Sequence, residues 1–308
     1  MTPSSTLLDW FDRSGRRLAF RTTSDPWAVL VSEVMLQQTP VSRVEPAWQA
    51  WMRRFPTPAA SAEASPADAL RAWAGLGYNR RALALRRTAV TIVEEHGGIV
   101  PRDVATLVTL PGIGAYTARA VAAIAFGQPV AAVDTNLRRV VGRMVTGSGP
   151  SMAASVLQAT ADSLIDGTRP AAWTHAMMDV GATICRPRVP ECGRCPLRDG
   201  CRFAIEMAEP AGPAGPLRAA EAASWIRSSG AGHAATARSA PFHSTSRWLR
   251  GRIIDRLRAA PDGSWLHLTG AIGDHPPSRV AEAVSALQGE GMLERRHDGA
   301  LRLPLGRS

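Results

Sequence analysis

The chain contains the stretch Leu110-Pro111-Gly112-Ile113-Gly114, which separates two segments whose apolar residues recur at helical spacing. The second segment covers residues 116–126. Glycine adopts the positive φ that a tight turn requires, so Gly112 and Gly114 predict a short hairpin between two helices. The unpaired backbone N–H groups at the start of the second helix could hold a phosphate of any nucleotide sequence. A turn that merely joins two helices is the alternative.

Four residues are the only cysteines of the chain: Cys185, Cys192, Cys195 and Cys201, spaced C-x6-C-x2-C-x5-C. Nothing ahead of the first helical segment resembles a secretory signal, so we expect reduced thiols rather than disulfides. Structural zinc sites usually join two short cysteine pairs across a longer loop, whereas only Cys192 and Cys195 form a tight pair here. Four thiolates in one compact segment favour a [4Fe–4S] cluster, with zinc as the alternative.

The sequence contains 36 arginines and no lysine. Reactions that need a side-chain amine, such as Schiff-base formation at an abasic sugar, are therefore excluded for the side chains. The net charge of +10 and the sequence pI near 11.0 favour a polyanionic partner, because arginines that bind phosphates release counterions. No apolar stretch approaches the ~20 residues of a membrane-spanning helix, so we expect no membrane association. We expect a monomer in the cytoplasm, associated with the nucleoid.

Helical periodicity extends from about residue 5 to residue 206. Residues 208–241 are rich in Ala, Gly, Pro and Ser, which predicts a flexible linker. A basic helix at 247–259, a second helix at 278–289 and two short strands around an Asp-Gly turn then predict a small domain at 242–308. This order is typical of a winged-helix-like α+β module. A small α+β cap with no partner is the alternative.

The glycine hairpin, the downstream Asp134 in Val-Asp-Thr-Asn and the cysteine spacing together resemble the endonuclease III superfamily of DNA glycosylases. Within that superfamily, residues 32–39, Ser-Glu-Val-Met-Leu-Gln-Gln-Thr, are similar to the signature of the adenine DNA glycosylases (the MutY family). The resemblance covers about residues 7–205. It implies a mainly α, two-lobed helix-hairpin-helix DNA glycosylase fold with a [4Fe–4S] cluster loop.

The resemblance also implies how the helical part is divided. Residues 1–23 and 134–207 would form a discontinuous iron–sulfur cluster domain, and residues 24–133 a six-helix domain that contains the hairpin. The implied activity is that of a monofunctional DNA glycosylase of base excision repair. It would hydrolyse the N-glycosidic bond of adenine mispaired with 8-oxoguanine or guanine in double-stranded DNA.

Such hydrolysis needs an acid that protonates the departing base and a carboxylate that stabilises an oxocarbenium-like sugar. Glu33 is the predicted acid, because it lies in an otherwise apolar helical segment where desolvation would raise its pKa. Asp134 is the predicted carboxylate, because N-cap hydrogen bonds would favour its ionised form. A solvent-facing glutamate and a simple helix cap are the alternatives. Tyr116 stands where bifunctional members carry their nucleophilic lysine, so the resemblance implies no β-elimination and a Tyr116 hydroxyl near the carboxyl groups. A helix residue that packs beside the hairpin is the alternative.

Base excision also requires the nucleotide to leave the duplex, and a side chain must fill the gap. The resemblance implies that the Gln-Gln-Thr run wedges into the duplex and that Tyr78 stacks on the opposite base; ordinary loop polarity is the alternative. The predicted DNA contacts are Gln37, Gln38, Thr39, Tyr78, Gly112, Gly114 and Asn136.

The sequence departs from the family pattern in three places. Phe20 and Arg21 follow Leu18-Ala19 where the family commonly has Leu-Pro-Trp-Arg, so the wall of the predicted base pocket differs. His175 stands where relatives place Gln or Glu; it is predicted to contact the adenine, with core packing as the alternative. The tail lacks the strand pattern of the β-rich domain by which typical members recognise 8-oxoguanine.

Two other functions remain open at this point. Thymine glycosylases that act on G:T pairs share the fold, the cluster and a tyrosine at the position of Tyr116. A cluster-bearing regulator that binds DNA without catalysis is the alternative from a different class.

Overall fold

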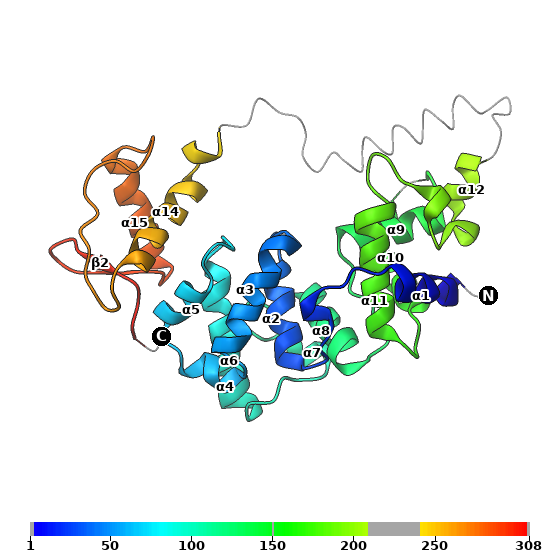
Figure 1. Ribbon diagram of the computed structural model, residues 1–308, viewed down its shortest axis with the longest axis horizontal. Helices are drawn as coiled ribbons and strands as arrows, with labels where there is room; N and C mark the ends of the chain where they lie inside the picture. The colour runs from blue at the N-terminus through cyan, green and yellow to red at the C-terminus, as the bar shows by residue number, and fades with distance from the viewer. Residues whose placement is uncertain (1–2, 150, 209–240, 307–308) are drawn as a thin grey trace. The chain divides into compact units, whose positions relative to one another are not determined.

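The computed structural model describes residues 3–149, 151–208 and 241–306. The described chain is mainly α-helical, with two short strands near its C-terminal end (Figure 1). This confirms the prediction of a mainly α chain with short strands near its C-terminal end. Residues 209–240, which make up nearly all of the predicted linker, lie outside the described residues. No helix in the described ranges has the length and apolar character needed to cross a membrane.

The chain divides into two compact units, each built from segments that are distant in sequence. Within the described residues, unit 1 comprises residues 3–18, 114–149 and 151–208, and unit 2 comprises residues 19–113 and 241–306. The division falls at Gly114, because the helix after the hairpin packs within unit 1. The segment predicted as a separate domain at 242–308 joins the same unit as the six-helix segment.

Unit 1 contains six α-helices within its described residues. They are α1 (Pro3–Ser14), α8 (Ala115–Phe126), α9 (Thr135–Thr146), α10 (Ala154–Leu164), α11 (Pro170–Asp179) and α12 (Arg202–Ala208). A π-helical turn, Val180–Ile184, continues α11 and leads into the cysteine segment, which contains short 3-10 turns at Cys192–Arg194 and Arg198–Gly200.

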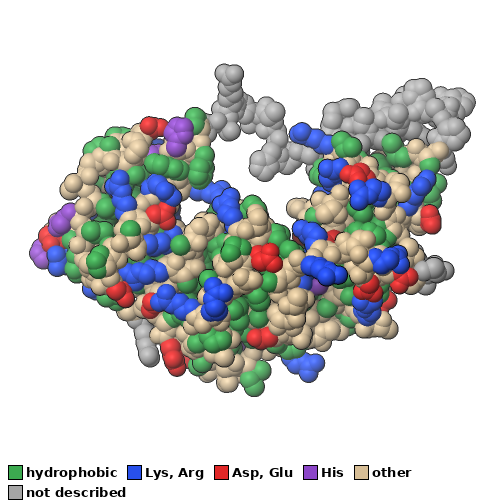
Figure 2. All heavy atoms as spheres, in the orientation of Figure 1, with side chains coloured by type: hydrophobic (Ala, Val, Ile, Leu, Met, Phe, Trp, Pro, Cys, Tyr) green, Lys and Arg blue, Asp and Glu red, His purple; other side chains and the backbone are tan. Residues whose placement is uncertain are grey.

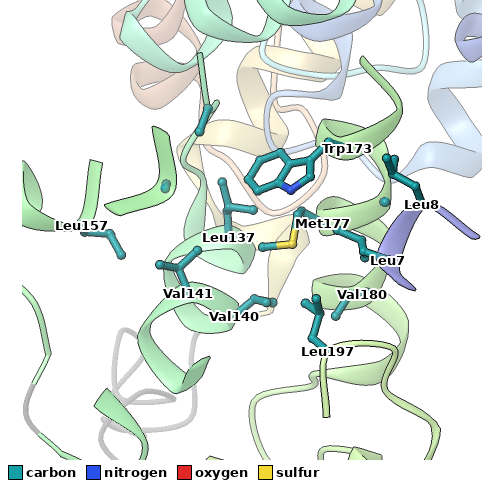
Figure 3. Packing of buried hydrophobic residues seen from close by; sticks show 13 residues of the cluster. Leu7, Leu8, Leu137, Val140, Val141, Leu157, Trp173, Met177, Val180 and Leu197 are labelled. Atoms are coloured by element: carbon teal, nitrogen blue, oxygen red, sulfur yellow. The ribbon is translucent and has the colours of Figure 1, made fainter. Parts of the chain in front are cut away.

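The core of unit 1 follows from the helical spacing of apolar residues. In α9, Leu137, Val140 and Val141 share one face, and they pack with Trp173 and Met177 of α11 (Figure 3). Further members of the cluster are Leu7, Leu8, Leu157, Val180 and Leu197. Leu197 comes from the cysteine segment, so the core anchors that segment to the helices.

Unit 2 contains α2 (Pro26–Leu36), α3 (Val41–Arg54), α4 (Pro58–Glu63), α5 (Pro66–Ala72), α6 (Arg80–His96) and α7 (Val104–Leu107). Helix α2 is central, because its residues from Trp27 to Met35 are all buried. It begins at Asp25, whose carboxylate accepts a hydrogen bond from the backbone N–H of Trp27 at 3.0 Å, and Pro26 supplies a pre-set helical φ.

The C-terminal module of unit 2 contains α14 (Ser246–Ala259), α15 (Pro277–Gly289), β1 (Glu294–Arg295) and β2 (Leu301–Arg302). Strands β1 and β2 pair antiparallel, with Glu294 opposite Arg302, and the turn between them contains Gly299 at φ 85°. Leu266 forms a bridge with Leu301, which adds a third extended segment beside the hairpin. These elements confirm the predicted helix, helix, hairpin order.

Candidate functional site

Glu33 is buried in helix α2 and does not face solvent. Its side chain is 4% exposed, and its neighbours Val29, Leu30 and Val34 are apolar and buried as well. The solvent-facing alternative is therefore wrong. A carboxyl group in such surroundings is a hallmark of functional sites, since burial of a carboxylate is otherwise unfavourable.

Two loops of unit 2 contain strained backbone. Gln38 (φ 56°) follows α2 and Tyr78 (φ 47°) precedes α6, and they are the only non-glycine residues with positive φ in the described chain. Side chains in this region of φ are unfavourable, and such strain is concentrated at functional sites. Thr39 is buried and its hydroxyl donates to the carbonyl of Leu76 at 3.3 Å, so the two loops lie against each other. The structure thus brings together the predicted DNA contacts of these loops.

Arg81, which the sequence analysis missed, holds both loops. Its Nη1 donates to the carbonyls of Val34 (2.9 Å) and Gln37 (2.6 Å) at the end of α2. Its Nη2 donates to Thr39 Oγ1 (2.8 Å) and the carbonyl of Gly77 (3.3 Å). Desolvation lowers the pKa of Arg81 to about 10. Arg81 lies in the first turn of α6, where a positive charge interacts unfavourably with the helix dipole. This unfavourable position was the feature of the sequence that could have identified Arg81.

The predicted base-pocket residues of unit 2 form a 3-10 turn, Ala19–Arg21. Phe20 is buried edge-on against Trp48 of α3, with ring centroids 6.3 Å apart, and Arg21 is half-buried beside it. The turn is anchored by Glu45, whose carboxylate accepts from the backbone N–H of Ala19 at 2.7 Å. Phe20 thus belongs to the packing between this turn and α3.

The glycine hairpin approaches α6 closely. Gly112 has φ 78°, and a Cβ at that position would lie 2.9 Å from the Cβ of Ala84, so no larger residue fits without a shift. The hydroxyl of Thr88 donates to the carbonyl of Pro111 at 2.6 Å and fixes the turn. Gly114 is the N-cap of α8 and has an ordinary φ of −90°. Tyr116 is the second residue of α8 and is half-buried.

Asp134 of unit 1 is the N-cap of α9 and is half-buried. Its Oδ1 accepts from the backbone N–H of Leu137 at 2.7 Å, and its Oδ2 accepts from Asn136 Nδ2 at 3.0 Å. Asn136 Oδ1 in turn accepts from Arg139 at 2.8 Å, and Arg139 also donates to the carbonyl of Cys185 at 2.7 Å. A continuous set of hydrogen bonds therefore links the predicted carboxylate to the first cysteine.

His175 lies in α11 with its side chain 9% exposed. Its ring stacks on Phe11 of α1, with centroids 6.3 Å apart and planes 24° apart. This contact is part of the packing of α1 on α11. It corresponds to the alternative that His175 packs in the core and does not contact the adenine.

The cysteine segment is anchored by Arg143, a second residue that the sequence analysis missed. Arg143 is 1% exposed; it donates to Cys185 Sγ at 3.2 Å and to the carbonyls of Arg186 and Pro187 at 2.9 Å each. Its guanidinium carbon lies 4.8 Å from the ring centroid of Phe203. Arg139 and Arg143 are four residues apart on one face of α9, a spacing that could have indicated a shared partner.

The four thiols fit a metal cluster in the chemistry of their donors. Desolvation raises the pKa of Cys195 to about 12, and it also raises the pKa values of Cys192 and Cys201. The charge of the neighbouring Cys185 raises these pKa values further. Within the described residues, no three His, Cys, Asp or Glu side chains converge in a geometry that could hold a metal ion. Four cysteine thiols in one segment are the donor set of a [4Fe–4S] cluster, and metal binding would offset the cost of burying their thiolate forms.

The predicted site residues fall into two groups. Glu33, the Gln37–Thr39 loop, Tyr78, Gly112 and the Phe20 turn belong to unit 2; Gly114, Tyr116, Asp134, Asn136, His175 and the cysteines belong to unit 1. Basic side chains are numerous on the visible face of both units (Figure 2).

Comparisons with known proteins show the family to which the chain belongs. Residues 31–160 match the family model of the HhH-GPD superfamily of base excision DNA repair proteins. The chain is 41% identical over 300 residues to the adenine DNA glycosylase of Mycolicibacterium smegmatis, a match that covers 96% of this chain and 94% of that protein. It is 42% identical over 208 residues to the human adenine DNA glycosylase, covering 64% of this chain and 38% of the human protein.

Solved structures show the same fold. A thermostable thymine-DNA glycosylase superposes with a TM-score of 0.62 at 29% identity, over 66% of this chain and 95% of that one. Endonuclease III in a non-covalent DNA complex gives a TM-score of 0.56 at 23% identity, over 67% of this chain and 98% of that one.

The fold and the family match define a DNA glycosylase of the HhH-GPD superfamily. Within that superfamily, the chain belongs to the adenine DNA glycosylase family, as the resemblance predicted.

Proposed function

We propose that the protein hydrolyses the N-glycosidic bond of adenine in double-stranded DNA where the adenine is mispaired with 8-oxoguanine or guanine. The burial of Glu33 in the apolar helix α2, in a chain 41% identical over nearly its whole length to an adenine DNA glycosylase, carries this proposal. A carboxyl group that is 4% exposed favours its neutral form and can hold a proton for the departing base.

In the proposed reaction, Glu33 transfers its proton to a ring nitrogen of adenine while the bond to the sugar breaks. The bonding electrons leave with the base, and positive charge develops on the sugar. Asp134, whose carboxylate oxygens accept two hydrogen bonds, stabilises that charge. Water then adds to the anomeric carbon and gives its proton to the Glu33 carboxylate, which leaves an abasic sugar, free adenine and the regenerated acid.

We propose that Tyr116 contributes a hydroxyl near the reacting carboxyl groups. Because the chain has no lysine, no side-chain amine is available to attack the abasic sugar. The abasic product should therefore stay intact until alkali cleaves it.

We further propose that the four cysteines hold a [4Fe–4S] cluster. When bound, the cluster would tie its four thiolates together and fix the loop; hydrolysis requires no electron transfer from it. Arg143, at 3.2 Å from Cys185 Sγ, would lie against the anionic centre, and Arg139 would hold the backbone of Cys185.

The test uses single-turnover incubation of the full-length protein with duplexes that contain A:8-oxoguanine, A:G, G:T or only matched pairs, followed by alkaline cleavage. We expect cleavage at the adenine of the first two duplexes and none before alkali. Cleavage only at the thymine of G:T would instead support a thymine glycosylase. Binding with no cleavage of any duplex would support the non-catalytic regulator.

A further inference from the structure

A groove of about 770 Å³ lies within unit 2, between the C-terminal module and the two strained loops. One wall contains Gln37, Gln38 and residues 75–81. The other wall comes from α14 and from the 3-10 turn that precedes it, Phe242–Ser244. The proposed reaction chemistry uses no residue of the C-terminal module.

The charged lining of the groove is mostly arginine. Its basic residues are Arg43, Arg80, Arg81, Arg247, Arg250, Arg252 and Arg258. The two acidic residues of the lining already have arginine partners: Asp255 pairs with Arg252 and Arg258, and Glu290 pairs with Arg250 at 2.8 Å. The lining therefore keeps an excess of guanidinium groups, which suit phosphate oxygens in charge and in geometry.

Arg247 and Tyr78 meet across the groove. Arg247 Nη1 donates to the Tyr78 hydroxyl at 2.7 Å, and its guanidinium carbon lies 4.0 Å from the centroid of the Tyr78 ring. Both side chains are exposed, and Tyr78 is 38% exposed. Because a guanidinium group has five N–H donors, this stacked arginine keeps donors for an anionic ligand beside Tyr78.

Other contacts fix the C-terminal module in this position within unit 2. Arg258 Nε donates to the carbonyl of Leu70 at 2.8 Å, and its Nη2 donates to Asn79 Oδ1 at 2.7 Å. The backbone N–H of Ala67 donates to the carbonyl of Pro304 at 2.9 Å. The module is thus attached to α5 and to the residue that follows Tyr78, which holds α14 beside the strained loop.

We propose that this groove binds the phosphodiester backbone of DNA next to Tyr78, with Arg247 of the C-terminal module and the exposed Arg43 of α3 as phosphate ligands. The proposal rests on the proposed action on DNA and assigns a binding role to a segment that the reaction chemistry does not use. Such contacts depend on charge and not on base identity, so they act equally on mispaired and matched duplexes.

The test measures the Kd of the full-length protein for a labelled A:G duplex and a matched duplex over a series of salt concentrations. Arg247→Ala and Arg43→Ala each remove one charge from the groove, on α14 and on α3 respectively. Arg295→Ala is the control, because Arg295 is exposed on β1 outside the groove lining. Thermal melting verifies that each variant is folded.

For each groove variant, we expect the slope of log Kd against log salt concentration to fall by about 0.9 on both duplexes. This is the change that the loss of one phosphate contact produces. Affinity at moderate salt should fall roughly tenfold, while the control keeps the wild-type slope. An unchanged slope in both groove variants would overturn the proposal. A loss confined to the A:G duplex would also overturn it, because that result means base reading.

Adenine release by the wild-type protein is measured in parallel and separates this proposal from the proposed function. Release together with unchanged slopes in the variants would refute the groove alone. No release together with reduced slopes would refute the proposed reaction and leave the groove supported.

Discussion

Arg81 donates a hydrogen bond of 2.6 Å to the carbonyl of Gln37, the residue that precedes the strained Gln38. The same guanidinium group reaches the carbonyl of Gly77, the residue that precedes the strained Tyr78. One side chain therefore holds both loops in a backbone conformation that non-glycine residues rarely adopt.

Replacing Arg81 by Gln should destabilise unit 2. The variant leaves carbonyl groups at the ends of both loops without their donor, so the free energy of unfolding should fall by about 1–3 kcal/mol. Urea denaturation followed by circular dichroism measures this change. Arg80→Gln is the matched control; Arg80 is exposed, and its variant should stay within about 0.5 kcal/mol of the wild type. Equal stability of both variants would show that Arg81 does not hold the loops.

Asp134→Asn separates helix capping from catalysis. Asparagine is as good an N-cap as aspartate, so the stability of the protein should change little. The negative charge is lost, however, and single-turnover adenine release should slow by about 100-fold or more. Rate measurements at saturating enzyme, together with thermal melting, test this expectation. If Asp134→Asn releases adenine at the wild-type rate, Asp134 acts only as a helix cap.

Cys192→Ser tests the proposed cluster. The wild-type protein, purified without oxygen, should contain about four iron atoms per chain and absorb visible light, and the variant should lose both properties. Met152→Leu is a control, because Met152 lies outside the cysteine segment and packs against the core of unit 1. Zinc at full occupancy in the wild-type protein, with no visible absorption, would favour the zinc alternative.

The sequence predicted those parts of the molecule that depend on local patterns. Helix α6, Arg80–His96, lies within the predicted helical region at about residues 5–206, and it ends at Gly97, whose φ of 61° favours glycine. The glycine hairpin was predicted from Gly112, whose positive φ and close approach to Ala84 require glycine. The burial of Glu33 was predicted from the apolar residues around it.

The remaining features depend on contacts between distant segments. Nothing local indicates that Arg81 reaches the end of α2, or that Arg143 donates to Cys185. The basic helix predicted at 247–259 is α14, and nothing local indicates that its Arg247 and Arg258 contact the segment around Tyr78. The division of the chain at Gly114 depends on the packing of α8 on α11, which periodicity does not specify.

The central claim is that Glu33 supplies the proton that releases adenine. The most direct measurement compares Glu33→Gln with the wild-type protein in single-turnover release from an A:8-oxoguanine duplex, with the Kd for the same duplex measured alongside. Glutamine preserves the size of the side chain but carries no acidic proton, so release should fall by at least ~100-fold while the Kd stays within about threefold. Release by Glu33→Gln at the wild-type rate, with the Kd unchanged, would contradict the account.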